Sequence, residues 1–245
     1  MLAAERQSWI LQHLEERGRI SIAEITRGLG VSPATARRDL ALLQRAGLLR
    51  RVHGGAVVQQ PEIPQATSED LALAEEVYRH LHPGDTVAVA GETLAPLVAR
   101  RLLEAPLRLL FITNHLEAAH LLRQSPSVEI LLLGGRLHRG SYTLPLPSST
   151  GDLKLLVTNQ AFVEVEGLEV RAGISSASAA IAQFERELLN HALHKVVVSP
   201  ARRLGILFPH RVLGLSEVDL WITTHLSPEQ RETISPLVHL IEANR

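Results

Sequence analysis

The stretch SIAEITRGLGVSPATARRDLALLQRAG, residues 21–47, predicts two short helices joined by a tight turn. Ser21 is followed three residues later by Glu24, which is the capping-box pattern that begins a helix. Gly30 ends this helix, and Ser32 caps the next one, whose first position is a proline that loses no hydrogen bond there. Two helices in this arrangement form a helix-turn-helix, whose second member normally enters the major groove of DNA.

The second helix of this pair has one apolar face and one polar face. At about 100° per residue, Ala36, Leu40 and Leu43 lie on one side and are predicted to be buried. The outward and flanking positions are candidates for contacts with guanine edges or with phosphates. Asp39 is less expected beside them, and we interpret it as a partner that orients an arginine. The candidate DNA-contacting residues of this helix are Ser32, Ala34, Thr35, Arg37, Arg38 and Arg45.

A segment that follows the helix pair completes the predicted DNA-binding domain. Residues 48–52 and 56–58 flank a His-Gly-Gly turn and predict a β-hairpin. Its basic side chains, Arg50, Arg51 and His53, would form a wing that grips the DNA backbone or the minor groove. The helix pair alone would fit a three-helix bundle with a charged solvent face equally well, but the basic wing argues against that alternative.

The charge of the chain is unevenly divided. The 245 residues have a net charge of −1, but residues 1–60 contain nine arginines and five acidic residues. The other 185 residues contain 16 basic and 21 acidic ones. A basic N-terminal region and an acidic remainder are expected if only residues 1–60 bind a polyanion such as double-stranded DNA. A charge difference of this size could also arise by chance, so it does not establish DNA binding by itself.

Composition disfavours several kinds of site and location. The chain has no cysteine, which excludes disulfides, thiolate chemistry and cysteine-ligated zinc. It contains no HExxH, Walker A or GxGxxG pattern, so we expect no metal and no cofactor. No apolar run reaches the roughly 18 residues of a membrane helix, and the charged N-terminus is unlike a signal peptide. We therefore expect a soluble cytoplasmic protein without membrane contact.

From about residue 69 the pattern alternates between helices and short apolar strands. Such alternation favours a mostly parallel sheet covered by helices on both faces, in a Rossmann-like α/β domain. The predicted helices are residues 71–81, 97–103 and 116–122, and the predicted strands are residues 86–89, 107–112, 128–133, 161–165, 196–198 and 218–222. The fold class is thus α+β multidomain, with a winged helix-turn-helix at 1–58, a linker at 59–68 and an α/β domain at 69–245.

The N-terminal motifs resemble those of the DeoR-type bacterial transcription regulators. The resemblance covers almost all of residues 1–58 and departs mildly at Ala36, where the family usually has isoleucine. Weaker matches continue in the family's order and spacing toward the C-terminus. The matching segments are ERQ (5–7), IAEI (22–25), GVS (30–32), TARRDL (35–40), GLLRRVHGGA (47–56), GDTV (84–87), ITN (112–114), LGG (133–135), AF (161–162), VD (218–219) and IT (222–223).

The resemblance implies a role for the C-terminal domain. In that family the domain resembles sugar-phosphate isomerases and usually binds a phosphorylated sugar or a related metabolite, so a small-molecule effector is expected here. Ligands of open α/β sheets bind beyond the carboxyl ends of the strands. The corresponding candidate effector-binding residues are Gly91, Glu92, Thr93, Thr113, Asn114, Gly134, Gly135 and Arg203.

The positions that should bind phosphate differ from the family pattern. The family's Asp-Ser-Gly-Thr-Thr loop reads AGETL at residues 90–94, which places Glu92 where backbone amides would hold the anion. Asn-Gln replaces an Asp-Lys pair before residue 161, Glu185 stands where lysine is common, and Pro200 and Arg203 replace a later Asp and Lys. We therefore expect simple sugar phosphates to bind weakly or not at all, with Arg203 a candidate partner for Glu92 instead.

The predicted function is sequence-specific DNA binding by a transcription regulator, and not catalysis. The resemblance to the family implies that the regulator is a repressor. A homodimer or homotetramer on repeated half-sites is expected, because one helix-turn-helix module buries too little surface to be selective. One alternative is a sugar-phosphate isomerase-like enzyme, which would need the acidic and basic residues that are replaced here. Another is a regulator whose sensor domain is vestigial and only oligomerises. The operator and the effector are left open by the sequence.

Overall fold

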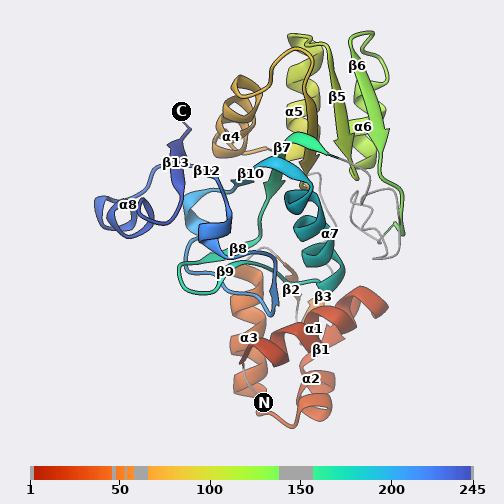
Figure 1. The fold of residues 1–245 in the computed structure, drawn as a ribbon. Coiled ribbons are helices and arrows are strands. Elements are labelled where there is room, and N and C mark those ends of the chain that lie inside the picture. Colours follow the sequence, from red (N-terminus) through yellow and green to blue (C-terminus); the bar gives the residue numbers. More distant parts are fainter. Residues whose placement is uncertain (1–2, 46–47, 53, 58–65, 138–156, 244–245) are drawn as a thin grey trace. The chain divides into compact units, whose positions relative to one another are not determined.

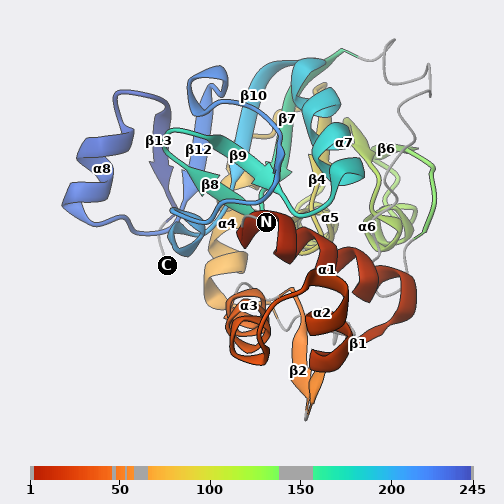
Figure 2. The same cartoon turned by 90° about the horizontal axis from the view of Figure 1, so that it is seen from below.

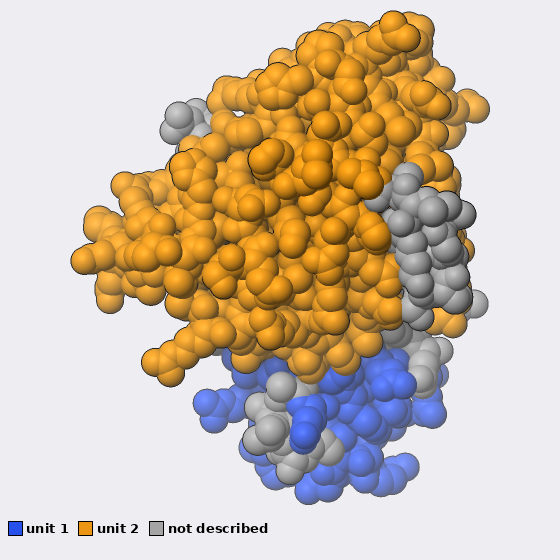
Figure 3. Space-filling model, in the orientation of Figure 1, with its two compact units in different colours: residues 1–63, 138–140 blue, residues 64–137, 141–245 orange. Residues whose placement is uncertain are grey.

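The computed structural model describes residues 3–45, 48–52, 54–57, 66–137 and 157–243. The chain divides into two compact units, which Figure 3 shows in different colours. Unit 1 comprises residues 1–63 and 138–140, and unit 2 comprises residues 64–137 and 141–245. Hydrophobic core clusters form within each unit from that unit's own helices and strands.

Unit 1 contains helices α1 to α3 (Figure 2) and a small antiparallel sheet. The strand order of this sheet is β1-β3-β2. The predicted hairpin is confirmed as β2 and β3, which pair antiparallel. A further strand that the sequence pattern did not reveal, β1, pairs with the other edge of β3. The elements are α1 (Ala3–Arg17), β1 (Arg19–Ser21), α2 (Ile22–Leu29), α3 (Pro33–Arg45), β2 (Arg50–Val52) and β3 (Gly55–Val57).

Local hydrogen bonds and glycines fix the turns of unit 1. Ser21 and Glu24 form the predicted capping box: the Glu24 N–H donates to the Ser21 hydroxyl at 3.1 Å, and the Ser21 N–H donates to the Glu24 carboxylate at 2.7 Å. Gly30 ends α2 with a left-handed φ of 63°, which glycine adopts without strain. Gly55 has no room for a side chain, because the backbone of Ile20 in β1 lies against it.

One cluster of buried side chains joins the helices of unit 1 to its sheet. Ala36, Leu40 and Leu43 of α3 are at most 2% exposed, which confirms the face predicted from helical spacing. Ile10 of α1 and Ile25 of α2 pack in the same cluster and are fully buried. Because this side of α3 is buried, its opposite side faces solvent.

Unit 2 contains a parallel sheet of seven described strands in the order β13-β12-β10-β7-β4-β5-β6 (Figure 1). The strands are β4 (Thr86–Ala90), β5 (Leu109–Thr113), β6 (Val128–Leu132), β7 (Thr158–Glu164), β10 (Ala192–Val198), β12 (Leu220–Thr223) and β13 (His239–Glu242). A smaller antiparallel sheet, of order β11-β9-β8, contains β8 (Gly167–Glu169), β9 (Gly173–Ser176) and β11 (His210–Arg211). The helices are α4 (Ser68–Arg79), α5 (Leu94–Glu104), α6 (Leu116–Leu122), α7 (Ala179–Asn190) and α8 (Pro228–Ile234), with short 3-10 turns η2 (Ala201–Arg203) and η3 (Leu215–Glu217).

The predicted alternation of helices and strands is confirmed, with differences at several elements. α5 begins at Leu94 rather than residue 97, and β5 begins at Leu109 rather than residue 107. The strands of the small sheet are two to four residues long, which is too short for a period to be visible in the sequence. α7, α8 and β13 were also not predicted, although the buried residues of α7 do recur at helical spacing.

The two faces of the large sheet carry separate cores. Successive residues of a strand point to opposite faces of a sheet. Val87 and Val89 of β4 accordingly pack in the cluster with α4, α5 and α6, whereas Ala88 and Ala90 pack in the cluster with α7. Helices therefore cover both faces, as the apolar strands predict for a parallel sheet.

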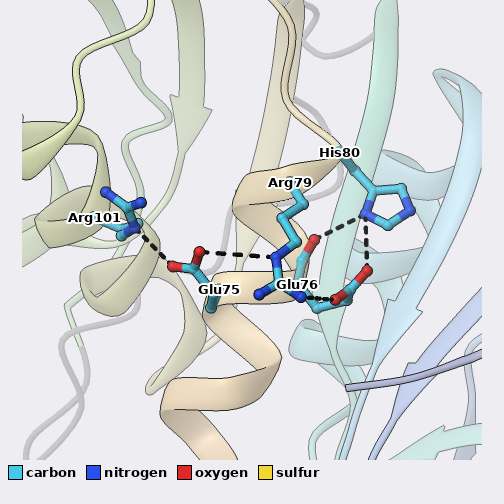
Figure 4. Close-up of polar contacts among 5 residues, drawn as sticks. All are labelled: Glu75, Glu76, Arg79, His80 and Arg101. Atoms are coloured by element: carbon cyan, nitrogen blue, oxygen red, sulfur yellow. Dashed lines mark hydrogen bonds and ion pairs between the residues drawn. The ribbon is translucent and has the colours of Figure 1, made fainter. Parts of the chain in front are cut away.

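An ion pair connects α4 with α5 in unit 2, and further polar contacts lie along α4 (Figure 4). Arg101 of α5 donates to Glu75 of α4 at 2.7 Å. Arg79 lies 3.8 Å from Glu75 and 2.9 Å from Glu76. His80 Nδ1 lies 2.8 Å from the backbone carbonyl oxygen of Glu76. Such partly exposed pairs contribute about 0–1 kcal/mol each. The Arg101–Glu75 pair therefore adds little to two helices that pack mainly through buried leucines and valines.

Candidate nucleic-acid interface and effector site

The outward face of α3 carries two arginines. Arg37 and Arg38 are both exposed, and neither is in an ion pair with a described residue. Ala34 is exposed one turn earlier, and Thr35 is half-buried. Arginines that are not committed to partners inside the protein are available to guanine edges and to phosphates.

Ser32 fixes the beginning of α3. The Thr35 N–H donates to the Ser32 hydroxyl at 3.1 Å, and the two hydroxyl oxygens lie 2.9 Å apart. Ser32 is therefore the predicted cap of the helix. A helix that enters the major groove contacts base edges mainly with its N-terminal residues, and this cap sets where those residues begin.

Asp39 lies on the buried side of α3 and is only 2% exposed. Its carboxylate accepts two hydrogen bonds from Arg6 of α1, at 2.8 Å and 3.0 Å. The hydrogen bond to Asp39 is the largest influence on the pKa of Arg6 and raises it. Asp39 does orient an arginine, as the sequence suggested, but that arginine belongs to α1, and the pair ties α1 to α3.

The wing is basic where the structure describes it. Arg50 and Arg51 of β2 are exposed, opposite Val57 and Ala56 of β3. β2 lies at the edge of the three-stranded sheet, so its outer side is open to a partner. His53 and the side chain of Arg45, which were also predicted to contact DNA, lie outside the described residues.

The predicted effector-binding residues follow strands of the parallel sheet. Because the strands run in one direction, their carboxyl ends lie along one edge. The structure places the predicted residues along that edge but not in one environment. Thr113 and Asn114 are fully buried, Gly134 and Gly135 are exposed, and Gly91, Glu92, Thr93 and Arg203 are partly buried.

A small cavity of about 10 Å³, enough for a single water molecule, lies beside the N-terminus of α5 at this edge. Of the predicted effector-binding residues, Thr93 is one that lines it. The other lining residues come from α4, α5, the end of β7 and the end of β10: Asp70, Leu73, Leu94, Glu164, Val198, Ser199 and Pro200. Its charged lining residues, Asp70 and Glu164, are both acidic, which is unfavourable for a phosphate.

Glu164 is the carboxylate that meets the loop before α5. Its Oε2 accepts hydrogen bonds from the N–H groups of Thr93 at 2.9 Å and Leu94 at 3.0 Å. Burial is the largest influence on its pKa and raises it, while the two N–H groups and the positive charge of Arg203 lower it. Arg203 thus acts on Glu164, and the suggested pairing of Arg203 with Glu92 stays a prediction.

Two more carboxylates lie near Glu164. Glu185 of α7 is 5% exposed, and its Oε2 has no hydrogen-bond partner among the described residues. Burial raises its pKa well above the ordinary value, and the charges of Glu166 and Glu164 raise it further. Glu166 accepts hydrogen bonds from the Ser176 hydroxyl at 2.7 Å and the Ala177 N–H at 2.8 Å. This part of unit 2 therefore brings several carboxyl groups together, and the raised pKa of Glu185 favours its neutral form.

Asn114 is the predicted site residue with the least satisfied side chain. Both its amide oxygen and its amide nitrogen are buried without a hydrogen-bond partner among the described residues. Thr113 beside it accepts a hydrogen bond from the His115 N–H at 3.1 Å, and His115 Nδ1 accepts one from the Ala118 N–H at 3.3 Å. Burial lowers the pKa of His115, so the neutral ring caps α6.

Other kinds of site find no support in the described part of the chain. No group of three or more His, Asp or Glu side chains there is arranged to hold a metal ion. None of the helices described is long and apolar enough to cross a membrane.

The arrangement of a helix-turn-helix with a basic wing and a separate parallel α/β domain is matched by known families. A DeoR-like helix-turn-helix domain matches residues 6–62, and a DeoR C-terminal sensor domain matches residues 65–225. The chain belongs to the DeoR family. DeoR-family chains are transcription regulators rather than enzymes. The family therefore favours a transcription regulator over the isomerase-like enzyme considered as an alternative.

Relatives of this chain match it over nearly its full length. The transcriptional regulator GolR of Listeria innocua is 25% identical, with 91% of each chain covered. The transcriptional repressor CsqR of Escherichia coli is 29% identical, over 91% of this chain and 88% of the relative. Among solved structures, ribose 5-phosphate isomerase A of Methanocaldococcus jannaschii is similar over 55% of this chain and 53% of its own, at 16% identity and a TM-score of 0.39 that is too low to support an argument.

Glu164 and Asp70 are site residues that the sequence reasoning missed. Glu164 does leave a signal, because it is a charged residue near the end of the apolar run AFVEV, residues 161–165. Asp70 also forms the capping box of α4 with Thr67. Its presence in the sequence is explained by this cap, so the sequence gives no sign that it also lines the pocket.

Proposed function

We propose that this DeoR-family chain is a repressor that binds a specific double-stranded DNA sequence through unit 1. The observation that carries the proposal is the open arginine face of α3 beside the basic edge strand β2. Relatives that are named as transcriptional regulators and as a repressor support it. Because the target is DNA, we propose the cytoplasm as the place of action.

Each part of unit 1 has a role in this proposal. Arg37 and Arg38 of α3 bind base edges and flanking phosphates in the major groove. Arg50 and Arg51 of the wing bind phosphates without reading sequence. The remaining members of the proposed interface, at the ends of α3 and at the tip of the wing, are Ser32, Ala34, Thr35, Arg45 and His53.

We propose that unit 2 both oligomerises and senses. The proposed domain boundaries are 1–58 for DNA binding, 59–68 for the linker and 69–245 for sensing and assembly. Half-site recognition requires two DNA-binding units at a fixed separation, which favours a homodimer or homotetramer. Sedimentation of the full chain at micromolar concentration should show such an assembly. A monomer that retains full DNA affinity would contradict it.

We propose that a small-molecule effector binds at the carboxyl edge of the large sheet, and that it is not a simple sugar phosphate. The support is the acidic lining of the pocket by Asp70 and Glu164, and the buried amide of Asn114, which has no hydrogen-bond partner among the described residues. Asn114 offers one donor group and one acceptor to a polar ligand. The proposed effector-binding residues are Gly91, Glu92, Thr93, Thr113, Asn114, Gly134, Gly135 and Arg203.

The DNA-binding proposal is tested by separating the units. A duplex selected from a random library with the full chain should be bound by the full chain and not by residues 64–245 alone. The reason is that Arg37, Arg38, Arg50 and Arg51, the exposed arginines proposed to contact DNA, all belong to residues 1–63. Equal binding by residues 64–245, measured by fluorescence anisotropy at the same salt concentration, would overturn the proposal.

A further inference from the structure

The N-terminus of α5 is bound to a carboxylate from a distant part of the chain. Glu164, 70 residues away from Leu94, accepts the Thr93 and Leu94 N–H groups through the single oxygen Oε2. The side chain of Thr93, the N-cap of α5, makes no capping hydrogen bond. The first N–H groups of a helix lack partners within the helix, and the helix dipole favours an anion there. Glu164 therefore lies where such a helix holds an anionic ligand.

The loop before α5 accommodates this side chain closely. Gly91 has a φ of 141°, and a Cβ at this position would overlap the Cβ and the Oε2 of Glu164. A larger residue at position 91 would push Glu164 away from the helix. Burial raises the pKa of Glu164 on balance, and the positive charge of Arg203 is the smallest of the influences that lower it. A glycine, two N–H donors and a cation are thus arranged around a carboxylate that is part of the chain.

We propose that Glu164 is a built-in ligand that closes the phosphate-binding position at the N-terminus of α5, so the effector of unit 2 carries no phosphate there. This inference rests on the proposed role of unit 2 as a sensor. A group tethered to its own site competes at an effective concentration in the millimolar range or above. A free phosphate ester would have to displace Glu164 from both N–H groups and would also meet the carboxylate of Asp70, which lines the same pocket.

A different interpretation is that Glu164 only caps α5. A cap stabilises the helix, but its removal need not leave a phosphate site. The two interpretations therefore differ in what the protein binds after the carboxylate is removed. Glu164→Ala should open the site, because it removes the carboxylate and keeps Gly91, the N–H groups and Arg203.

The experiment titrates the full chain with inorganic phosphate by calorimetry and by thermal shift. We expect Glu164→Ala to bind phosphate at least about tenfold more tightly than the unsubstituted chain, with a melting temperature that rises with phosphate concentration. Glu164→Asp keeps the charge on a side chain one methylene shorter, so its gain should be smaller. It also provides a second variant if the alanine variant does not fold.

Glu169→Ala is the matched control. Glu169 likewise accepts two backbone N–H groups through one oxygen, from Arg171 at 2.8 Å and Ala172 at 2.7 Å, but it is the last residue of β8 in the small sheet and is not bound to α5. This variant should bind phosphate no better than the unsubstituted chain. A folded Glu164 variant without gain, a gain equal to that of the Glu169 control, or tight phosphate binding by the unsubstituted chain would each overturn the inference. DNA binding, measured on the same samples, tests the proposed function independently.

Discussion

The recognition face of α3 and the N-terminus of α5 are both suited to anions, but one is open and the other is filled. On α3, Arg37 and Arg38 are exposed and lack ion pairs among the described residues, while the acidic Asp39 is buried against Arg6. On α5, the chain's own Glu164 holds the first N–H groups. The difference shows that positively charged or N–H groups alone do not make an anion-binding site. These groups must also be without hydrogen-bond or ion-pair partners inside the protein.

The comparison is tested most severely by removing Asp39, the acid on the buried side of α3. Asp39→Ala should destabilise unit 1 by about 3–5 kcal/mol, because it leaves the guanidinium of Arg6 without its buried partner. DNA binding should fall with the loss of folded unit 1. Chemical denaturation followed by circular dichroism measures the first effect. Asp39→Asn, which keeps the shape and one acceptor oxygen, is the control and should lose less stability.

The exposed arginines of α3 give the next largest expected effect. Arg38→Ala should reduce affinity for the selected duplex by about 1–3 kcal/mol and relax the preference at one base position. Arg123→Ala, an exposed arginine at the end of α6 in unit 2, is the matched control and should leave affinity unchanged. Competition with single-base variants of the duplex measures both. An unchanged base preference would mean that Arg38 binds phosphate only.

Glu185, the buried acid on α7, should make the stability of unit 2 depend on pH. The pKa of Glu185 is raised by burial, so its favourable contribution to stability is present below its unfolded pKa and is lost as pH rises through its folded pKa. Glu185→Gln should therefore raise the melting temperature at pH 8, and should raise it much less at pH 5. Each kcal/mol gained in the free energy of unfolding should raise the melting temperature by about 2–4 °C. Glu187→Gln on the same helix is the less buried control. An equal effect of Glu185→Gln at both pH values would contradict the assignment.

The wing gives the smallest expected effect. Arg50→Ala should weaken binding to all duplexes alike and lower the slope of log affinity against log salt by about one unit, because it removes one phosphate contact. Affinities for the selected duplex and a scrambled duplex at several salt concentrations measure this slope. A change in the ratio between the two duplexes would instead show that Arg50 reads sequence.

The DNA-binding unit could be predicted almost completely from the sequence because its signals are local. The buried side of α3 follows from the spacing of Ala36, Leu40 and Leu43, and the cap of α2 follows from Ser21 and Glu24. β1 was missed because it is three residues long and is defined by its pairing with β3, more than 30 residues later.

The sensor site could be predicted only in outline. The residues after β4, β5 and β6 were expected from the rule that ligands bind at the carboxyl ends of strands. The contact that distinguishes the site joins Glu164 to Thr93, 71 residues apart, and no local pattern encodes such a pairing. The sequence pointed to Glu92 as the carboxylate of this loop, whereas the structure adds Glu164 directly on the N–H groups of Thr93 and Leu94.

The central claim, that the open arginine face of α3 reads a DNA sequence, is tested most directly by a ratio of affinities. The full chain is titrated against the selected duplex and a scrambled duplex of the same composition, at a fixed salt concentration near the physiological value. A specific regulator should bind the selected duplex about 10³-fold more tightly or better, and Arg37→Ala with Arg38→Ala should bring the ratio close to one. A ratio near one for the unsubstituted chain, or a high ratio that survives both substitutions, would contradict the account.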